Sequence, residues 1–193
     1  MPVPSVDLLT RSHIFLVQAV DRLLAEEPEL TDVIEVHLAG VLSPLDREIA
    51  ERTSYCRLHG YLSHDESVAL LRSSQLLFLP MHDLPQGTRA GLVPGKTYEY
   101  LGAGRPILAA VPDGDARDIL AAAGNATICR PADVDALSRG IRDQIDKWRS
   151  GTQRSAAQRD VVARFERRRL TEQLADVLAA AEGAGRTLQL LSS

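Results

Sequence analysis

Residues 91–112 read GLVPGKTYEYLGAGRPILAAVP, and this stretch mixes glycines and prolines with a lone lysine and an apolar run. Gly and Pro at this density do not allow a long helix. The stretch therefore predicts a turn, a short helix over 96–102 and a buried strand over 106–111. Residues 90–97, AGLVPGKT, also fit a loose form of the P-loop pattern, which raises the question of a phosphate site.

The spacing argues against a P-loop NTPase. A P-loop joins a strand directly to a long helix, so that backbone amides wrap the phosphates. Here the preceding apolar run ends at Pro80, fifteen residues before Gly95, and the helix after Lys96 is interrupted by Gly102 and Gly104. No later strand ends in the Asp that would hold Mg²⁺. A phosphate site is retained, and the P-loop is rejected.

A short helix that begins at Pro94–Gly95 is suited to a diphosphate. Proline is tolerated at a helix start because its missing N–H would have no partner there. We expect the amides of Gly95, Lys96 and Thr97 to point out of a helix N-terminus, which carries about half a positive charge. Lys96 adds a full charge, and Thr97 adds a hydroxyl.

Glu99 follows closely, and a carboxylate there would repel phosphate but could accept two hydrogen bonds from a diol. Phosphate donors beside a diol acceptor indicate a nucleoside diphosphate. The alternative is structural: Lys96 and Glu99 stand at i, i+3 on one helix and could form an ion pair with no ligand.

Composition sets the broad class. The chain has 193 residues, of which 45% are hydrophobic and 25% charged, with a net charge of −4. These values indicate one globular domain and give no sign of nucleic-acid binding. No apolar run reaches the ~18 residues of a membrane span, and no signal peptide is visible, so a cytoplasmic location is expected. Cys56 and Cys129 lack metal-ligand spacing and are expected to be buried free thiols.

Apolar periodicity alternates between strands and helices along the chain, which predicts βαβ units and a parallel sheet. In such sheets, ligands bind at the carboxyl ends of the strands. Residues 1–183 are expected to form one domain and residues 184–193 a flexible tail. His37 and His59 fall in strands and are interpreted as core or edge residues. Helices are predicted over 12–26, 43–53, 63–74, 115–123, 133–149 and 153–182, and further strands over 33–40, 55–62, 75–80 and 126–130.

Residues 94–120, PGKTYEYLGAGRPILAAVPDGDARDIL, resemble the donor-site segment of group 1 glycosyltransferases of the GT-B type. In one subset of that family, Pro-x-Lys-x-x-Glu-Tyr is followed by Leu-x-x-Gly-x-Pro. Further blocks agree in order over about residues 11–150. The resemblance implies the carboxy-terminal half of a GT-B fold: an α/β, Rossmann-like parallel sheet of five or six strands, helices on both faces and a long C-terminal helix. That half binds the nucleotide sugar.

The resemblance assigns roles to individual residues. Glu99 matches the second Glu of a Glu-(seven residues)-Glu motif, which holds the ribose hydroxyls; the first Glu would fall at position 91, where this chain has Gly91. His82 follows a strand at the expected edge and could approach the sugar. No metal and no other cofactor is expected, and no catalytic residue is assigned. The remaining matches are Pro94, Gly95, Lys96 and Thr97 at the diphosphate, Arg11 at a phosphate, and Gly60 and Tyr61 at the base.

A complete GT-B enzyme has a second domain that holds the acceptor, and nothing in this sequence corresponds to it. The first strand of the donor-binding half, expected just before Arg11, is at best incomplete within residues 1–10. Its place would be an open slot unless residues 5–9 or another chain fill it, or unless the chain is a fragment.

Two functions follow from this reading. The first is a donor-binding domain that transfers sugar only with a separate acceptor domain. The alternative is a non-catalytic, truncated glycosyltransferase-like module that acts as a partner-binding subunit. The expected partners are a nucleotide sugar and an N-terminal acceptor domain or a second copy, without nucleic acid and without a membrane span.

Overall fold

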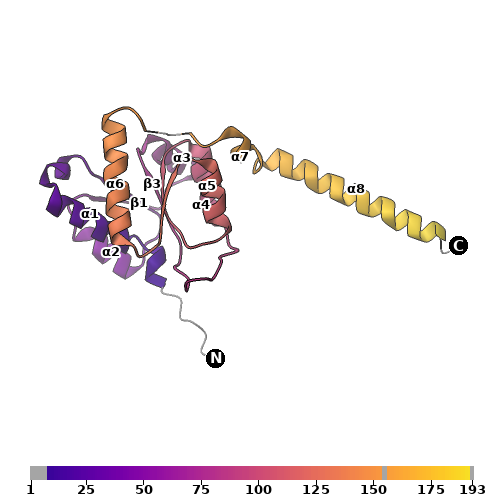
Figure 1. Ribbon diagram of the computed structural model, residues 1–193, viewed down its shortest axis with the longest axis horizontal. Coiled ribbons are helices and arrows are strands. Elements are labelled where there is room, and N and C mark those ends of the chain that lie inside the picture. The colour runs from indigo at the N-terminus through magenta and orange to yellow at the C-terminus, as the bar shows by residue number, and fades with distance from the viewer. Residues whose placement is uncertain (1–7, 154–155, 192–193) are drawn as a thin grey trace, which may run out of the picture.

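The computed structural model describes residues 8–153 and 156–191, with side chains placed for residues 9–153 and 156–181. Strands and helices alternate along this part of the chain, as the periodicity predicts (Figure 1). The strands are β1 (Val36–Ala39), β2 (Cys56–Gly60), β3 (Leu77–Pro80), β4 (Ile107–Ala110) and β5 (Ala126–Cys129). The helices are η1 (Leu8–Arg11), α1 (Ile14–Glu26), η2 (Pro28–Asp32), α2 (Pro44–Glu51), α3 (His64–Ser73), α4 (Gly95–Ala103), α5 (Asp115–Ala123), α6 (Val134–Arg149), α7 (Arg159–Ala163) and α8 (Arg167–Leu191).

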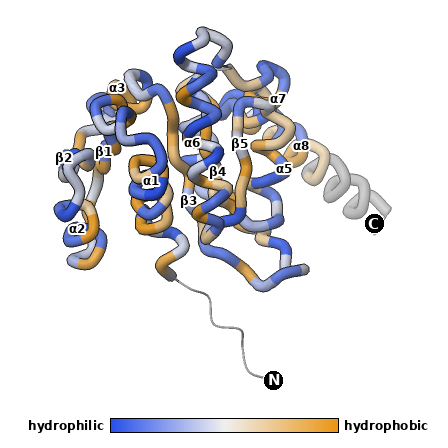
Figure 2. Tube along the Cα trace, turned by 60° about the vertical axis from the view of Figure 1, so that its left-hand side comes forward, coloured by the Kyte–Doolittle hydropathy of each residue, from blue (hydrophilic) through white to orange (hydrophobic). Residues whose placement is uncertain are grey.

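All strand pairs of the described chain are parallel, but the strands belong to two sheets. β1 pairs with β2, and β3, β4 and β5 form a second sheet in that order. Figure 2 shows the β1–β2 pair set apart from the other three strands. The α/β, Rossmann-like class is therefore confirmed, with the five strands divided two and three instead of running continuously.

β4 is the centre of the core because alternate residues point to opposite faces of a strand. Leu108 and Ala110 pack with α1 and α6, whereas Ile107 and Ala109 pack with α4, α5 and α7. All four residues are fully buried. Helices thus cover both faces of the three-stranded sheet, and full burial of a side chain such as Leu108 is worth about 1.5–3 kcal/mol.

The helix starts follow local sequence rules. Ser63 and Glu66 form a capping box at the start of α3: the Ser63 hydroxyl accepts from the Glu66 amide at 3.3 Å, and the Glu66 carboxylate accepts from the Ser63 amide at 2.8 Å. At the start of α2 the Ser43 hydroxyl accepts from the Asp46 amide at 3.1 Å, and Pro44 lies in the first turn. Gly104 ends α4 in the left-handed conformation, at φ 67°, which glycine adopts without a Cβ clash.

The C-terminal helix differs from the prediction of one helix over 153–182. Val161 of α7 is buried against α5, and Phe165 packs on Tyr98 of α4 with ring centroids 4.9 Å apart. These contacts hold α7 on the sheet, and α8 then leaves the body of the domain in another direction (Figure 1). α8 continues to Leu191 through residues that the sequence placed in a flexible tail; residues 192–193 lie outside the described part.

The N-terminal segment also differs from the expectation of a partial first strand over residues 5–9. Leu8 to Arg11 form η1, a 3-10 helix, and residues 5–7 lie outside the described part. Thr10 is 3% exposed, and its hydroxyl accepts from the Asp83 amide at 2.8 Å. The chain therefore enters the domain beside the carboxyl end of β3.

Candidate functional site

The candidate site begins at the N-terminus of α4. Pro94 is the N-cap residue in an extended conformation, and Gly95 opens the helix. The Thr97 amide donates to the Pro94 carbonyl at 2.9 Å, so it is not free for a ligand. The amides of Gly95 and Lys96 have no backbone acceptor within the described chain, as expected for the first turn of a helix. Two amides and one lysine are thus available here.

Three of the predicted site residues line one cavity. It has a volume of about 690 Å³ and lies between β1 and β3. Arg11, Lys96 and Glu99 line it, together with Ala39 and Pro80 at the carboxyl ends of these strands. Two cations and one carboxylate thus line a single cavity, which runs along β1 and β3 and includes their carboxyl ends, where ligands of α/β proteins bind.

These three charges have no charged partner. Within the described residues, no ion pair or side-chain hydrogen bond involves Arg11, Lys96 or Glu99, and all three side chains are exposed. The alternative of a structural Lys96–Glu99 pair is therefore not formed. Several charges of helices α2 and α6, by contrast, do form ion pairs: Arg47 with Glu51, Arg142 with Glu26 of α1, and Lys147 with Asp143.

Thr97 lies away from the cavity lining. Its side chain is fully buried, and Oγ1 has no hydrogen-bond partner among the described residues. A hydroxyl in that state costs about 1–3 kcal/mol. The Thr97 side chain thus lies in the protein interior, and its role as a phosphate ligand stays a prediction.

The predicted base-binding loop follows β2. Gly60 has φ 67°, and its carbonyl accepts from the Gly40 amide at 2.7 Å. Tyr61 is 86% exposed, so its ring is not packed into the core. Neither residue lines the cavity with Lys96, and stacking of a base on Tyr61 stays a prediction.

His82 follows β3, and its role as a sugar contact is likewise untested. The side chain is half-buried, and Nδ1 is buried without a hydrogen-bond partner among the described residues. The next residue, Asp83, is held by Arg130, whose Nε lies 3.1 Å from both carboxylate oxygens, and this pairing raises the pKa of Arg130. Arg130 also donates to the Leu84 carbonyl at 2.7 Å.

The sequence analysis did not predict the residues that join the loops after β3 and β5. Asp83 and Arg130 tie the loops after β3 and β5 together, and Thr10 ties the N-terminal entry to the same point. A second tie joins Ala90 to Gly114, where the Ala90 amide donates to the Asp113 carbonyl at 2.8 Å. Gly114 has φ 150°, and a Cβ there would lie 2.2 Å from the Ala90 carbonyl oxygen. In the sequence, the one feature that could have indicated Asp83, Arg130 and Gly114 is that each follows a predicted strand.

His13 also lines the cavity and was not predicted. It is 7% exposed, and Nε2 has no partner among the described residues. Burial lowers the pKa of His13, although Asp46, 3.9 Å away, opposes the shift. Asp46 itself is held by hydrogen bonds from Ser12 and Ser43, which outweigh burial and lower its pKa. The imidazole is therefore neutral near pH 7.

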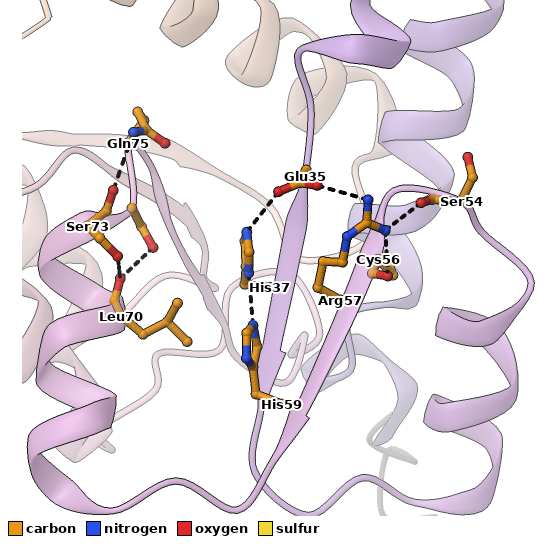
Figure 3. A network of polar contacts seen from close by, with 10 residues as sticks. Glu35, His37, Ser54, Cys56, Arg57, His59, Leu70, Ser73 and Gln75 are labelled. Carbon is orange, nitrogen blue, oxygen red and sulfur yellow. Dashed lines mark hydrogen bonds and ion pairs between the residues drawn. The ribbon is translucent and has the colours of Figure 1, made fainter.

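His37 and His59, predicted as core or edge residues, lie on the two edge strands β1 and β2. Both side chains are exposed, and their rings stack with centroids 5.1 Å apart (Figure 3). His37 Nδ1 lies 2.8 Å from His59 Nε2, and Glu35 contacts both His37 and Arg57. Within the described residues, no group of three or more His, Cys, Asp or Glu could hold a metal ion.

Cys129 is buried and Cys56 half-buried, and both are free thiols. Burial raises the pKa of Cys129 to about 12. Among the helices of the described chain, none combines the length and apolar character needed to cross a membrane.

Comparison with known proteins places the chain in a family. A sequence model of the family described as "Glycosyl transferases group 1" matches residues 9–147. Because the match covers well over half of the chain, the chain belongs to this family of glycosyltransferases. A search of curated proteins finds no match.

Solved structures show the fold. HepE of Anabaena, in complex with UDP-glucose, matches with a TM-score of 0.66 and 18% identity, over 91% of this chain and 47% of that chain. The GtfA/B complex matches with a TM-score of 0.62 and 18% identity, over 90% of this chain and 34% of that chain. Trehalose 6-phosphate synthase of Burkholderia multivorans matches with a TM-score of 0.61 and 16% identity, over 92% of this chain and 41% of that chain. The architecture is that of a Rossmann-like half of a GT-B glycosyltransferase.

The chain spans about a third to a half of the length of the solved structures that it matches. At these identities the likeness concerns the fold alone. Any proposal about the ligand therefore rests on the residues of the candidate site.

Proposed function

We propose that this chain is the donor-binding half of a glycosyltransferase and that it binds a nucleoside-diphosphate sugar. The observation that carries the proposal is the set of unpaired charges, Arg11, Lys96 and Glu99, that line one cavity between β1 and β3. HepE, which shares the fold, is described in complex with UDP-glucose. This supports the same ligand class here.

The roles follow from charge and position. Lys96 and the free amides of Gly95 and Lys96 hold the diphosphate, and Arg11, which lines the same cavity, holds a phosphate oxygen. Glu99 accepts hydrogen bonds from the ribose hydroxyls. Gly60 and Tyr61 receive the base, and His82 approaches the sugar. The two cations replace a metal in neutralising the diphosphate, so binding requires none.

We infer from residues 94–100 that the chain falls in the Pro-x-Lys-x-x-Glu-Tyr subset with a single Glu, because Gly91 stands where the other Glu would be. The sugar is then not contacted by a first-position carboxylate. Transfer to an acceptor requires a second, acceptor-binding domain. The cytoplasmic location remains a prediction.

Binding of UDP, GDP and dTDP by isothermal titration calorimetry tests the proposal. Lys96→Ala removes a charge-assisted contact and should weaken nucleoside-diphosphate binding about 10- to 100-fold, or ~1.5–3 kcal/mol. Lys147→Ala is the matched control, because Lys147 is the only other lysine and pairs with Asp143 on α6 at 2.6 Å. The Lys147→Ala variant should bind the nucleotides with the affinity of the wild type.

Absence of binding by the wild-type chain to all three nucleotides would remove the donor-site proposal. A stable complex with another protein, formed without any nucleotide affinity, would instead support the alternative of a non-catalytic module. Magnesium-dependent ATP turnover that is lost in Lys96→Ala would return the P-loop reading.

A further inference from the structure

Two histidines meet on the β1–β2 sheet, and neither is among the proposed nucleotide contacts. His37 Nδ1 lies 2.8 Å from His59 Nε2, and the two ring planes are inclined by only 21° (Figure 3). Both side chains are exposed. Imidazole nitrogens are the commonest protein ligands of transition metals. The pair therefore presents two such ligands at one point of the protein surface.

The pairing of the strands brings the two rings together. In the parallel β1–β2 ladder, His37 pairs with Arg57. Two residues later Ala39 pairs with Gly60, so the ladder skips His59. An extra residue of this kind forms a β-bulge, which changes the direction of a side chain and is found next to functional sites. The contact between the rings thus follows from the register of the sheet.

The distance between the two nitrogens suits two neighbouring ligands of a square-planar ion. Nitrogen ligands lie ~2.0–2.1 Å from a transition metal, so two of them at a right angle are about 2.9 Å apart, whereas two at a tetrahedral angle are about 3.3 Å apart. The 2.8 Å between His37 Nδ1 and His59 Nε2 is closer to the first value. Cu²⁺ prefers this geometry and Ni²⁺ shares it, and Cu²⁺ binds nitrogen ligands more strongly than Ni²⁺ does.

Glu35 prepares His37 for this role. Its Oε2 lies 3.4 Å from His37 Nε2 and favours a proton on that nitrogen. In the neutral pair, His37 Nδ1 then accepts the hydrogen bond from His59 Nε2. A carboxylate at the other ring nitrogen is the usual partner of a metal-bound histidine. When a metal binds, the proton of His59 Nε2 moves to Nδ1 of the same ring through water, and the exposed rings turn toward the ion.

The nearest cation is neutralised and held aside. Arg57 lies on the same face of the sheet, but its Nη2 is 2.8 Å from Glu35 Oε1. Its Nη1 donates to the Ser54 carbonyl at 2.6 Å and to the Cys56 carbonyl at 3.3 Å. Figure 3 shows the guanidinium directed toward these residues and away from the His59 ring. Its charge therefore opposes a metal ion at the histidine pair only weakly.

We propose that His37 Nδ1 and His59 Nε2 together bind one divalent transition-metal ion, Cu²⁺ in preference to the others, with water in the remaining positions. Glu35 orients His37 and is not a ligand. Two protein ligands are fewer than the three or four of catalytic and structural zinc sites, so the ion exchanges with solvent. It would join β1 to β2 directly before Gly60 and Tyr61. This inference does not depend on the proposed nucleotide site.

Titration of the full chain, without an affinity tag, with CuCl₂ tests the proposal. Calorimetry should show one strong Cu²⁺ site, and the electron paramagnetic resonance spectrum should show coupling to two imidazole nitrogens. His37→Ala and His59→Ala should each weaken Cu²⁺ binding about 100-fold, because the second imidazole binds intramolecularly. Each variant should also lose one coupled nitrogen. Both side chains are exposed, so circular dichroism should confirm that the variants fold.

His64→Ala is the matched control, because His64 is an exposed histidine outside the pair. Its Cu²⁺ affinity should stay within about twofold of wild type. Glu35→Gln tests the positioning role: affinity should fall about 10-fold, while the spectrum keeps both coupled nitrogens. Loss of a nitrogen in Glu35→Gln would show instead that Glu35 is needed to form the pair.

Two results would overturn the proposal. One is a wild-type chain that binds no Cu²⁺ or shows coupling to a single imidazole nitrogen. The other is unchanged Cu²⁺ affinity in the double variant His37→Ala, His59→Ala, which would place the ion at another histidine or at the terminal amine.

Discussion

Single residues set the chemistry of the site through charges that find no partner. Lys96 and Glu99 are spaced to form an ion pair on α4, yet the structure leaves both free beside Arg11. Other helix charges do form ion pairs, such as Arg22 with Glu26 on α1 and Lys147 with Asp143 on α6. Unpaired opposite charges on one cavity are suited to a ligand that carries both phosphate and hydroxyl groups.

Glu99→Gln separates binding of the ribose hydroxyls from binding of the diphosphate. Loss of the ionised acceptor should weaken UDP binding by about tenfold, because hydrogen bonds to a charged group are worth ~1.5–3 kcal/mol. Inorganic pyrophosphate, which has no ribose, should bind as well as to wild type or better, since a negative charge has been removed. Calorimetry with both ligands checks this. Equal losses for UDP and pyrophosphate would place Glu99 outside the ribose contact.

At the scale of elements, close packing positions α6 on the sheet. Gly140 of α6 faces β4 and β5: a Cβ there would lie 2.8 Å from Leu108 Cδ1 and 3.3 Å from Thr127 Cγ2. Leu108 is fully buried and cannot move away freely. The periodicity predicted α6, but nothing in the sequence singled out this glycine from the others.

Gly140→Val should therefore destabilise the fold by about 1–3 kcal/mol through overpacking. Gly102→Ala in α4 is the matched control, because its Cβ would meet open space and the substitution favours helix, by about 0.5–1 kcal/mol. Urea denaturation followed by circular dichroism measures both. A Gly140→Val variant as stable as wild type would show that α6 has room to shift.

Most elements and the region of the site were predictable from sequence, because they depend on local rules. The strand and helix alternation, the Ser63 capping box and the turn at Pro94–Gly95 are local patterns, and each is present. The burial of Thr97, the exposure of His37 and the tie between Asp83 and Arg130 depend on distant residues. Periodicity carries no information about such contacts.

At the scale of the whole molecule, two features lack partners within the described chain. One is the cavity between β1 and β3. The other is α8, which projects from the domain with the described side chains of residues 167–181 all exposed (Figure 1). Leu170, Leu174, Val177 and Leu178 form an apolar row along one side of α8, at the spacing of a helix face.

Removal of residues 167–193 should leave the stability of the domain unchanged within ~0.5 kcal/mol, because surface changes away from buried contacts have effects of that size. Thermal melting of the shortened and full chains checks this. Truncation before Arg159 is the contrast: it removes the buried residue Val161, and Tm should fall. A large loss on removing α8 alone would show that it packs on the domain.

The sequence by itself determined the class of fold, the order of the elements and the segment around Pro94–Lys96, because propensity, capping and apolar period are local. It also carried the family pattern, including Gly91 in place of a Glu. Only the tertiary structure decided which charges meet at the cavity, that Lys96 and Glu99 remain unpaired, and that the strands form two sheets with a cavity between them. Those outcomes depend on contacts between residues far apart in the chain, which packing alone specifies.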